Sequence, residues 1–396
     1  MKNSLKNILL GFIIFTTTAF SQNDKSCQQK SSYFICTWKT NNAGTSNNTS
    51  ITIPVIGGMF NYDIDWNDDG IFDEFGVTAS TTHDFGTEGI YKIAIKGDFP
   101  RIYFNNRGDK LKLIAINQWG SQKWKTMNNA FWGCINLEGK ANDKPDLSSV
   151  IDMDGMFENA SSFNQDIGDW DTSNITTMAG LFTGASSFNQ NINDWDTSNV
   201  TDMSYLFSEA SSFSQKLNHW NTSNVNNMQA MFQKATKFNG LINTWNTHNV
   251  TDMQLMFSQA IHFNQDISNW NTSKVETMHL MFQRASVFNQ NIEKWNTKNV
   301  INMAGMFANA SNFDQNIGSW NVSKLSNATD MFISAKLSTD NYDALLNGWK
   351  RQHTNKPIKF NAGLSNYCEA SVARDQLINN CNFTIVDNGH KCNKTF

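Results

Sequence analysis

The sequence lacks the marks of several common protein classes. Its 31 Lys and Arg against 35 Asp and Glu give none of the basic excess expected of a nucleic-acid-binding protein. Four prolines are too few for a polyproline linker or a mucin-like stalk. There is no H-E-x-x-H, no G-x-S-x-G and no glycine-rich phosphate loop. We therefore predict a non-enzymatic protein, although a glycosidase pair needs only two carboxylates that meet in space.

Long apolar runs are also missing after the first residues. Met1–Ser21 has a basic start, a short apolar run at Ile8–Phe15 and small residues before a cut preceding Gln22. These are the three parts of a secretory signal. The alternative, a membrane anchor, needs a longer run to cross about 30 Å of hydrocarbon. The mature chain is therefore predicted to be exported without a transmembrane span.

Cysteine is sparse, and its placement fits an exported protein. Cys27 with Cys36 would close a small N-terminal loop, and Cys368 with Cys392 or Cys381 would staple the C-terminal end. These are five cysteines, an odd number, so at least one of them is left over. A metal site is the alternative, but the sequence has no C-x-x-C to support it. Cys134, the sixth, occupies a small apolar position of the repeat, which predicts a free, packed thiol.

A 25-residue repeat dominates what is present. Tryptophan recurs at this step seven times, and phenylalanine, methionine and alanine recur with it. The tryptophans are Trp170, Trp195, Trp220, Trp245, Trp270, Trp295 and Trp320. A period of 20–50 residues is typical of stacked arrays, and 25 residues are too few for a propeller blade. The predicted fold is mainly β with short helices, a leucine-rich-repeat-like solenoid of about eight coils.

Within one unit, the spacing predicts a strand and a short helix. Met178, Leu181, Phe182 and Ala185 would share one helix face, and the strand would lie in Phe163–Trp170. Coils that cannot bury this surface alone would stack it into one core. A recurring asparagine would form an amide ladder that satisfies backbone groups; its members are Asn164, Asn189, Asn239, Asn264 and Asn289. The tryptophans could instead form a sugar-binding platform, but fixed core spacing favours a structural role.

The flanks divide the chain into four parts. Residues 31–115 alternate apolar and polar side chains in Ser50–Ile53, Tyr91–Ile95 and Arg101–Phe104, as expected for antiparallel strands of a sandwich. The predicted organisation is a signal peptide at 1–21, a β-sandwich at 22–115, the solenoid at 116–337 and a C-terminal cap at 338–396.

One loop has the ligand pattern of a calcium site. Asp65, Asn67, Asp69 and Asp73 occupy positions 1, 3, 5 and 9 of such a loop, and a glycine stands at position 6. Position 12 is Gly76, so the bidentate glutamate is missing. Structural calcium is therefore one prediction and a polar β-turn is the other; no other cofactor is expected.

The repeat resembles that of a known family. Its unit W-x-T-S-N-V-T-x-M-x-x-M-F-x-x-A-x-x-F-N-Q and the first coil, Ala130–Leu137, are similar to BspA-type leucine-rich-repeat proteins of bacteria. This resemblance implies a parallel-sheet solenoid, display on the bacterial cell surface or secretion, and adhesion to host or matrix proteins. Tyr342–Trp349 and Tyr367–Cys392 resemble the C-terminal cap of such proteins, and Tyr62–Gly70 resembles a polycystic-kidney-disease-type β-sandwich.

The partner expected is an extracellular protein or glycan, not nucleic acid. Residues 151–210 hold ten acidic and no basic side chains, whereas 211–298 hold seven basic and four acidic ones. One variable column is the predicted contact surface: Asp169, Asp194, His219, Thr244, Asn269, Lys294 and Ser319. Two alternatives stay open. One is a carbohydrate-binding accessory protein with exposed Trp119, Trp124 and Trp132, and the other is a structural spacer.

Overall fold

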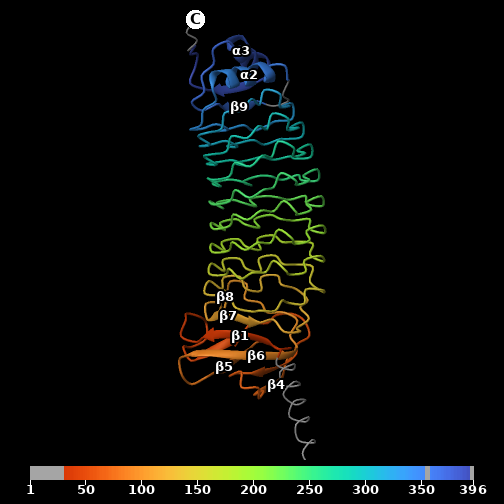
Figure 1. Ribbon diagram of the computed structural model, residues 1–396. Coiled ribbons are helices and arrows are strands. Elements are labelled where there is room, and N and C mark those ends of the chain that lie inside the picture. Colours follow the sequence, from red (N-terminus) through yellow and green to blue (C-terminus); the bar gives the residue numbers. More distant parts are fainter. Residues whose placement is uncertain (1–30, 353–356, 393–396) are drawn as a thin grey trace, which may run out of the picture.

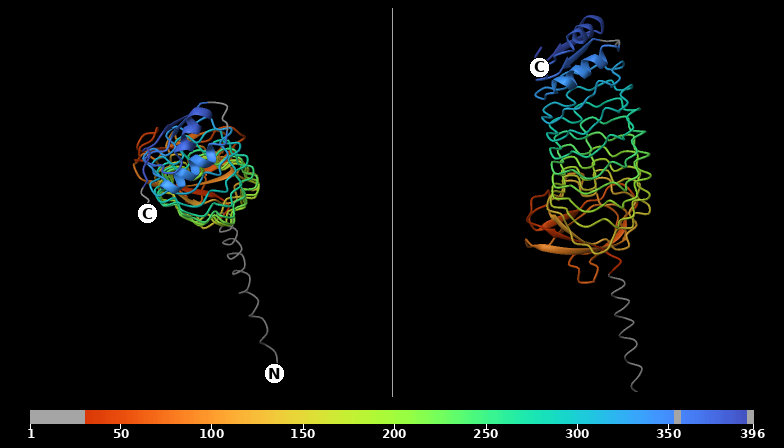
Figure 2. Two further views of the ribbon diagram at one scale, coloured as in Figure 1. Left: turned by 90° about the horizontal axis from the view of Figure 1, so that it is seen from above. Right: turned by 45° about the horizontal axis from the view of Figure 1, so that its top comes forward.

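The chain forms an elongated stack of coils with a different folded unit at each end (Figure 1). The computed structural model describes residues 31–352 and 357–392. The predicted signal peptide and Cys27 lie outside the described residues. Seen along the stack, successive coils lie over one another (Figure 2).

The N-terminal unit consists of two small sheets. Six strands are ordered β4-β3-β6-β1-β7-β8, and β2 pairs with β5 in a separate sheet. The strands are β1 Phe34–Lys39, β2 Ser50–Ile53, β3 Asn61–Asp65, β4 Glu74–Val77, β5 Thr81–Asp84, β6 Ile90–Asp98, β7 Leu113–Gln118 and β8 Glu138–Gly139. Two of the predicted strands, in β2 and β6, are confirmed. All pairings are antiparallel except β7 with β8.

The N-terminal unit continues directly into the stack. The strand β7 spans the predicted boundary between residues 115 and 116, and its partner β8 belongs to the first coils. Phe34, Trp38 and Ile51 are buried in the same apolar cluster as the coil residues. The prediction of a strand at Arg101–Phe104 is wrong, because the Phe104 N–H donates to the Ala130 carbonyl, a contact with the first coil.

The coils are joined by hydrogen bonds between equivalent backbone positions. Alternate N–H groups of one coil donate to the next coil, as from Met178 to Asp202 and from Phe182 to Leu206. The N–H groups between them close turns inside their own coil, as from Leu181 to Met178. Each coil therefore depends on its neighbour for half of the backbone partners in this segment, so the repeat is stable only as a stack.

The predicted short helix at Met178–Ala185 is wrong. Two positions four residues apart, Gly180 and Gly184, have positive φ, and equivalent positions do so in every coil. Left-handed residues interrupt an α-helix, whose hydrogen bonds join residues four apart. The apolar side chains still point inward, because consecutive turns reproduce the three- and four-residue spacing of a helix face. Spacing alone did not separate these two conformations.

The strand predicted at Phe163–Trp170 is also wrong. This segment is irregular, and the parallel bridges lie elsewhere, at one residue in each coil. They run from Asp152 to Thr177 and onward to Asn327. Ile167 and Trp170 are nevertheless buried as predicted. A high content of Asn, Asp and Gly favours turns over extended strands here.

The aromatic ladders are confirmed. From Trp220 to Trp320, neighbouring indole rings lie 6.1–6.5 Å apart and nearly parallel. Two phenylalanines per coil stack beside them, with Phe157 and Phe163 separated by 3.9 Å. Nearly every one of these rings is fully buried. The Trp ladder is therefore part of the core, and the alternative of a sugar-binding platform is wrong.

The amide ladder is confirmed as well. The Asn164 side-chain oxygen accepts from the Asn189 backbone N–H at 2.9 Å, and Asn264 does the same for Asn289. A second ladder, which sequence reasoning missed, is made by buried threonines. The Thr172 hydroxyl donates to the carbonyl of Asp196, one coil further on, and equivalent residues repeat this contact. Side chains thus satisfy backbone groups where the coil bends.

A C-terminal unit closes the stack. It contains α2 Thr339–Trp349, β9 Ile358–Asn361, α3 Ser371–Asn380 and β10 Phe383–Val386, with β9 and β10 parallel. Trp349 extends the Trp ladder, since its indole N–H donates to the Ile317 carbonyl. In the described part of the chain, no helix combines the length and the apolar character that crossing a membrane requires.

Candidate binding surface

The buried indole of each coil fixes an exposed corner beside it. The Trp195 N–H donates to the Ile167 carbonyl of the preceding coil at 2.9 Å, and the five later tryptophans of the repeat make the same bond. With the indole held inside, the residue before it turns outward. The backbone thereby presents one variable side chain per coil at the same place along the stack.

These outward residues are the predicted contact column, which we call the Asp169 column. All seven members are exposed: Asp169, Asp194, His219, Thr244, Asn269, Lys294 and Ser319. Two neighbouring members touch, since the Asp194 carboxylate lies 2.8 Å from Nδ1 of His219. The structure therefore brings the column together as a continuous line. A ligand for it stays a prediction.

The charge of this column changes along the stack. Its first two members are aspartates, and Lys294 lies near the C-terminal end. Lys144 is close to Asp169, at 3.7 Å, but both side chains are more than half exposed. Exposed pairs of this kind contribute little to stability. The surface charges are thus available for recognition rather than needed for the fold.

The carbohydrate alternative predicts three exposed tryptophans, and this prediction is wrong for two of them. Trp119 and Trp124 are fully buried, and Trp132 is half-buried. The Trp119 ring packs edge-on against Trp170 at 5.5 Å, so it closes the lower end of the Trp ladder. Its sequence position outside the 25-residue period concealed this core role.

The Asp65 loop is folded around its own backbone. The buried Asp65 carboxylate accepts from the N–H groups of Asn67, Asp69 and Gly70. Asp73 accepts from the Trp66 N–H at 2.8 Å. Across the described residues, no three acidic, His or Cys side chains are grouped to hold a metal ion. Calcium binding by this loop stays a prediction.

Sequence reasoning missed half-buried acidic residues close to the parallel bridges: Asp252 is a bridge residue, and Asp154 lies two residues after the bridge residue Asp152. Burial raises the pKa of Asp154, whose carboxylate accepts from the Thr177 hydroxyl and the Ala179 N–H of the next coil. Burial also raises the pKa of Asp252. The contacts of Asp154 are with the next coil, so its role is to join neighbouring coils.

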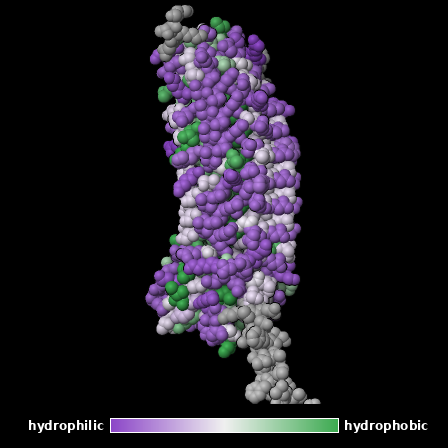
Figure 3. Space-filling model, in the orientation of Figure 1, coloured by the Kyte–Doolittle hydropathy of each residue, from purple (hydrophilic) through white to green (hydrophobic). Residues whose placement is uncertain are grey.

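Surface depressions on the described chain are shallow. One is lined by Thr251, Lys274, Glu276, Asn299, Ile301 and Lys324 on a side of the stack. In the view of Figure 3, the stack is mainly hydrophilic and apolar residues are scattered. An extended face, rather than a closed pocket, is what this geometry offers to a ligand.

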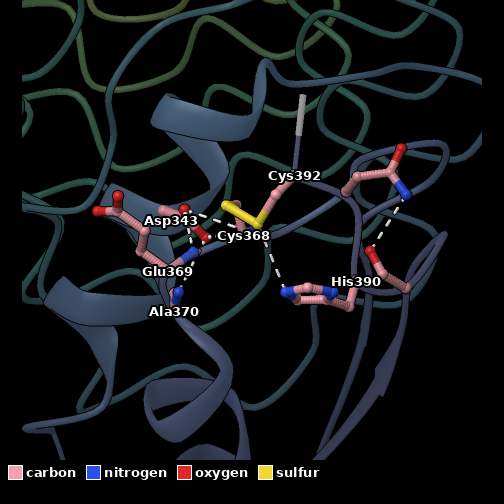
Figure 4. The surroundings of a disulfide bond; sticks show 8 residues. Asp343, Cys368, Glu369, Ala370, His390 and Cys392 are labelled. Carbon is pink, nitrogen blue, oxygen red and sulfur yellow. Dashed lines mark hydrogen bonds between the residues drawn. A yellow bond between two sulfur atoms is a disulfide. The ribbon is translucent and has the colours of Figure 1, made fainter. Parts of the chain in front are cut away.

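The cysteines follow the predictions where they are described. Cys368 and Cys392 form a disulfide, which settles the choice against Cys381 (Figure 4). Cys134 is free and fully buried, as predicted. Cys36 is fully buried in β1, where burial raises the pKa of its thiol to about 12. Because Cys27 lies outside the described residues, the Cys27–Cys36 pairing stays a prediction.

The disulfide lies beside a second link within the cap. The Asp343 carboxylate on α2 accepts from the N–H groups of Cys368, Glu369 and Ala370, just before α3 (Figure 4). A carboxylate is favourable at this end of a helix. Asp343 therefore ties α2 to α3 independently of the sulfur bond.

Comparison with known proteins assigns the repeat. A family model described as "Mycoplasma protein of unknown function, DUF285" matches residues 101–218, 125–242 and 240–345. The overlapping matches together span the coils and begin at the segment that contacts the first coil. None of the curated proteins matches the chain.

Proposed function

The chain belongs to the DUF285 family of proteins of unknown function, and on this premise we propose that it is an exported, non-enzymatic binding protein of the BspA type. Its stack would be a leucine-rich-repeat-like solenoid that presents the Asp169 column to an extracellular protein. The N-terminal unit would be a polycystic-kidney-disease-type sandwich.

One observation carries this proposal: the inside of the stack repeats, whereas the outside varies. At the Trp corner, the indole is the same in seven coils, but the residue before it is acidic, basic, amide or hydroxyl. Stacked repeats create extended surfaces whose side chains can change without disturbing the core. Because the described surface has shallow depressions and a polar outer face, a macromolecular ligand fits better than a small one.

The proposal is tested by binding of the mature chain, Gln22–Phe396, to arrays of matrix proteins and glycans. A face variant carries Asp169→Asn, Asp194→Asn and Lys294→Gln. A matched control carries Lys237→Gln and Glu276→Gln, which change exposed charges away from the Asp169 column. We expect binding to at least one protein, weakened about tenfold or more in the face variant only, because rim charges set electrostatic complementarity.

Other results would contradict it. Binding confined to glycans would favour the carbohydrate alternative, for which half-buried Trp132 is the remaining aromatic candidate. No binding, together with normal attachment of cells that lack the protein, would favour a structural spacer. Equal losses in both variants would show that the Asp169 column is not the contact surface.

We also propose that the Asp65 loop takes calcium, with oxygen ligands drawn from Asp65, Asn67, Asp69 and Asp73. The support is the alternate spacing of Asp65, Asn67 and Asp69, followed by Asp73, around a turn at Gly70, which has a positive φ. Calorimetric titration with Ca²⁺ should show heat that Asp69→Ala abolishes, and an equal melting temperature in calcium and chelator would contradict the proposal.

A further inference from the structure

Two exposed columns lie side by side at the Trp corner. The first is the Asp169 column. The second starts three residues earlier and is exposed except at half-buried Asn316. We call it the Asp166 column: Asp166, Asn191, Lys216, Leu241, Asp266, Asn291 and Asn316. Its Asp and Asn side chains accept from the backbone N–H two residues on, as Asp166 does from Gly168 and Asp266 from Ser268. Both columns therefore sit on one turn of each coil and form a single face.

Four of the six charges on this face form two mirror pairs of opposite sign about its middle coil. That coil carries Leu241 and Thr244, which are uncharged. One coil before it lies Lys216, and one coil after it lies Asp266 in the same column. Two coils before it lies Asp194, and two coils after it lies Lys294, again in one column. Asp194 and Lys216 thus each have an opposite charge at the mirror position along the stack, whereas Asp166 and Asp169 have the uncharged Asn316 and Ser319 there.

Such a pattern matches a second copy of the same chain turned upside down. We propose that two copies associate antiparallel through this face, around a two-fold axis at the coil of Leu241 and Thr244; the dimer covers the Asp169 column, so a ligand of that column would compete with the second copy. A two-fold axis lying across the stack keeps each column on itself and reverses the order of coils. Asp194 then meets Lys294 of the second copy, Lys216 meets Asp266 of the second copy, and each pair occurs twice.

The remaining positions agree with this arrangement. Leu241, 39% exposed, meets its own copy at the axis and buries apolar surface there. Asp169 and Asp166 face Ser319 and Asn316 of the second copy, so no like charges are opposed. Asp194 is free to reach across, because its side chain is 74% exposed even with His219 beside it. A parallel arrangement has its two-fold axis along the stack, so it exchanges the two columns within each coil and brings none of these opposite charges together.

Sedimentation equilibrium of the mature chain tests the inference. We expect dimers in dilute buffer that dissociate as salt is raised, because exposed charge pairs are screened. Lys294→Asp should weaken dimerisation about tenfold or more, since it turns two attractive pairs into repulsive ones. Asp194→Lys should do the same. The double variant Asp194→Lys, Lys294→Asp restores both pairs with reversed sign and should restore the dimer.

A matched control and a crosslink complete the design. Lys237→Asp makes the same charge change at an exposed position outside both columns and should leave the dimer intact. Leu241→Cys should crosslink to itself under mild oxidation, whereas Asp169→Cys should not, because six coils of about 4.8 Å separate the two copies of that residue. A chain that stays monomeric at about 500 µM in low salt overturns the inference. So do failed rescue by the double variant and self-crosslinking of Asp169→Cys.

Discussion

The stack and its two ends solve the same problem in different ways. Inside the stack, the backbone groups and aromatic rings of every coil bond to and stack on those of an equivalent coil. At the ends there is no equivalent neighbour, and unrelated residues take over. Trp119 packs edge-on against Trp170, the first indole of the ladder. Trp349, on α2, occupies the last position of the ladder. The ladders therefore continue beyond the repeat, although the 25-residue period does not.

The polar ladders end in the same way. The Asn289 side-chain oxygen accepts from the Asp314 backbone N–H, and the Asp314 carboxylate accepts from the Ser338 N–H and hydroxyl at the start of α2. Ser338 is also the N-cap of that helix. One serine thus closes a ladder and begins a helix. Capping units of this kind keep the ends of a stack from exposing unpaired groups.

The largest expected effect separates the middle of the stack from its end. Trp245→Ala removes a buried ring and leaves the Leu217 carbonyl without its indole donor, for a loss of about 3–5 kcal/mol. Because contacts run only between neighbouring coils, the stack should then unfold in two steps, one on each side of the defect. Trp349→Ala makes the same change in the cap and should loosen only the last coils.

Hydrogen exchange resolved along the chain checks this pair of variants. Trp245→Ala should speed exchange on both sides of its coil, and Trp349→Ala should do so only near residues 320–352. If both variants unfold in one transition at the same temperature, the stack is a single cooperative unit and the distinction between middle and end is wrong.

The second prediction concerns the N-terminal end, which contains a buried charge network that the coils lack. Lys112 is fully buried, and its ammonium donates to the carbonyls of Asn47 and Ser50 at 2.7 and 3.0 Å. Lys112→Met would leave these groups without a donor and cost about 2–4 kcal/mol. Chemical denaturation should show this loss, whereas Lys237→Met, on the exposed surface of the stack, should change stability by less than about 0.5 kcal/mol.

Acid should distinguish the same two regions. Burial alone would raise the pKa of Asp109, but hydrogen bonds from Ser46 and Thr52 and the charge of Lys112 hold it below its ordinary value. A lowered pKa in the folded state stabilises above about pH 4, and this contribution is lost as the pH falls through the folded pKa. The raised pKa of Asp154 acts in the opposite sense, because protonation favours the folded state there.

Melting temperature as a function of pH measures both effects. Asp109→Asn should flatten the loss of stability between about pH 5 and pH 3. Asp154→Asn should remove the gain in stability that protonation of Asp154 gives as the pH falls. It should also raise the melting temperature near neutral pH, where the Asp154 carboxylate would otherwise be ionised. Parallel acid limbs in the wild type and Asp109→Asn would show that this carboxylate does not carry the acid sensitivity of the N-terminal end.

The sequence predicts the repeating coils better than the two ends of the stack. Periodic side chains identified the buried Trp and Phe ladders, the Asn164 ladder and the exposed Asp169 column. They did not identify the backbone that connects them, because turns with left-handed residues place apolar side chains at helix spacing. A usable signal was present in Gly180 and Gly184 and in Gly155 and Asn159, which are residue types that tolerate positive φ. End residues such as Trp119 lie outside the period and could be assigned only from the structure.

The fourth prediction concerns the disulfide of the C-terminal cap. Cys368 and Cys392 are 24 residues apart, and a loop of this length contributes about 3 kcal/mol by restricting the unfolded chain. Cys368→Ser with Cys392→Ser should therefore lower the stability of the cap by about 2–3 kcal/mol, while the coils keep theirs. Asp343→Ala removes the neighbouring link between α2 and α3 and is the matched variant. Reduction that lowers protection throughout the stack would show that the cap is not an independent unit.

The smallest expected effect is a gain, and it tests the backbone of the coils directly. Arg284 is exposed and has a φ of 57°, and the equivalent residue four coils earlier, Gly184, shows that glycine fits this conformation without a side-chain penalty. Arg284→Gly should stabilise the chain by about 1 kcal/mol. The left-handed conformation costs an L-residue about 1–2 kcal/mol, and relief of this cost is partly offset by the larger backbone entropy that glycine loses on folding. Arg284→Ala removes the same side chain but keeps a Cβ, and should give no such gain. Equal melting temperatures for the two variants would mean that the left-handed turn at this position is not what strains the coil.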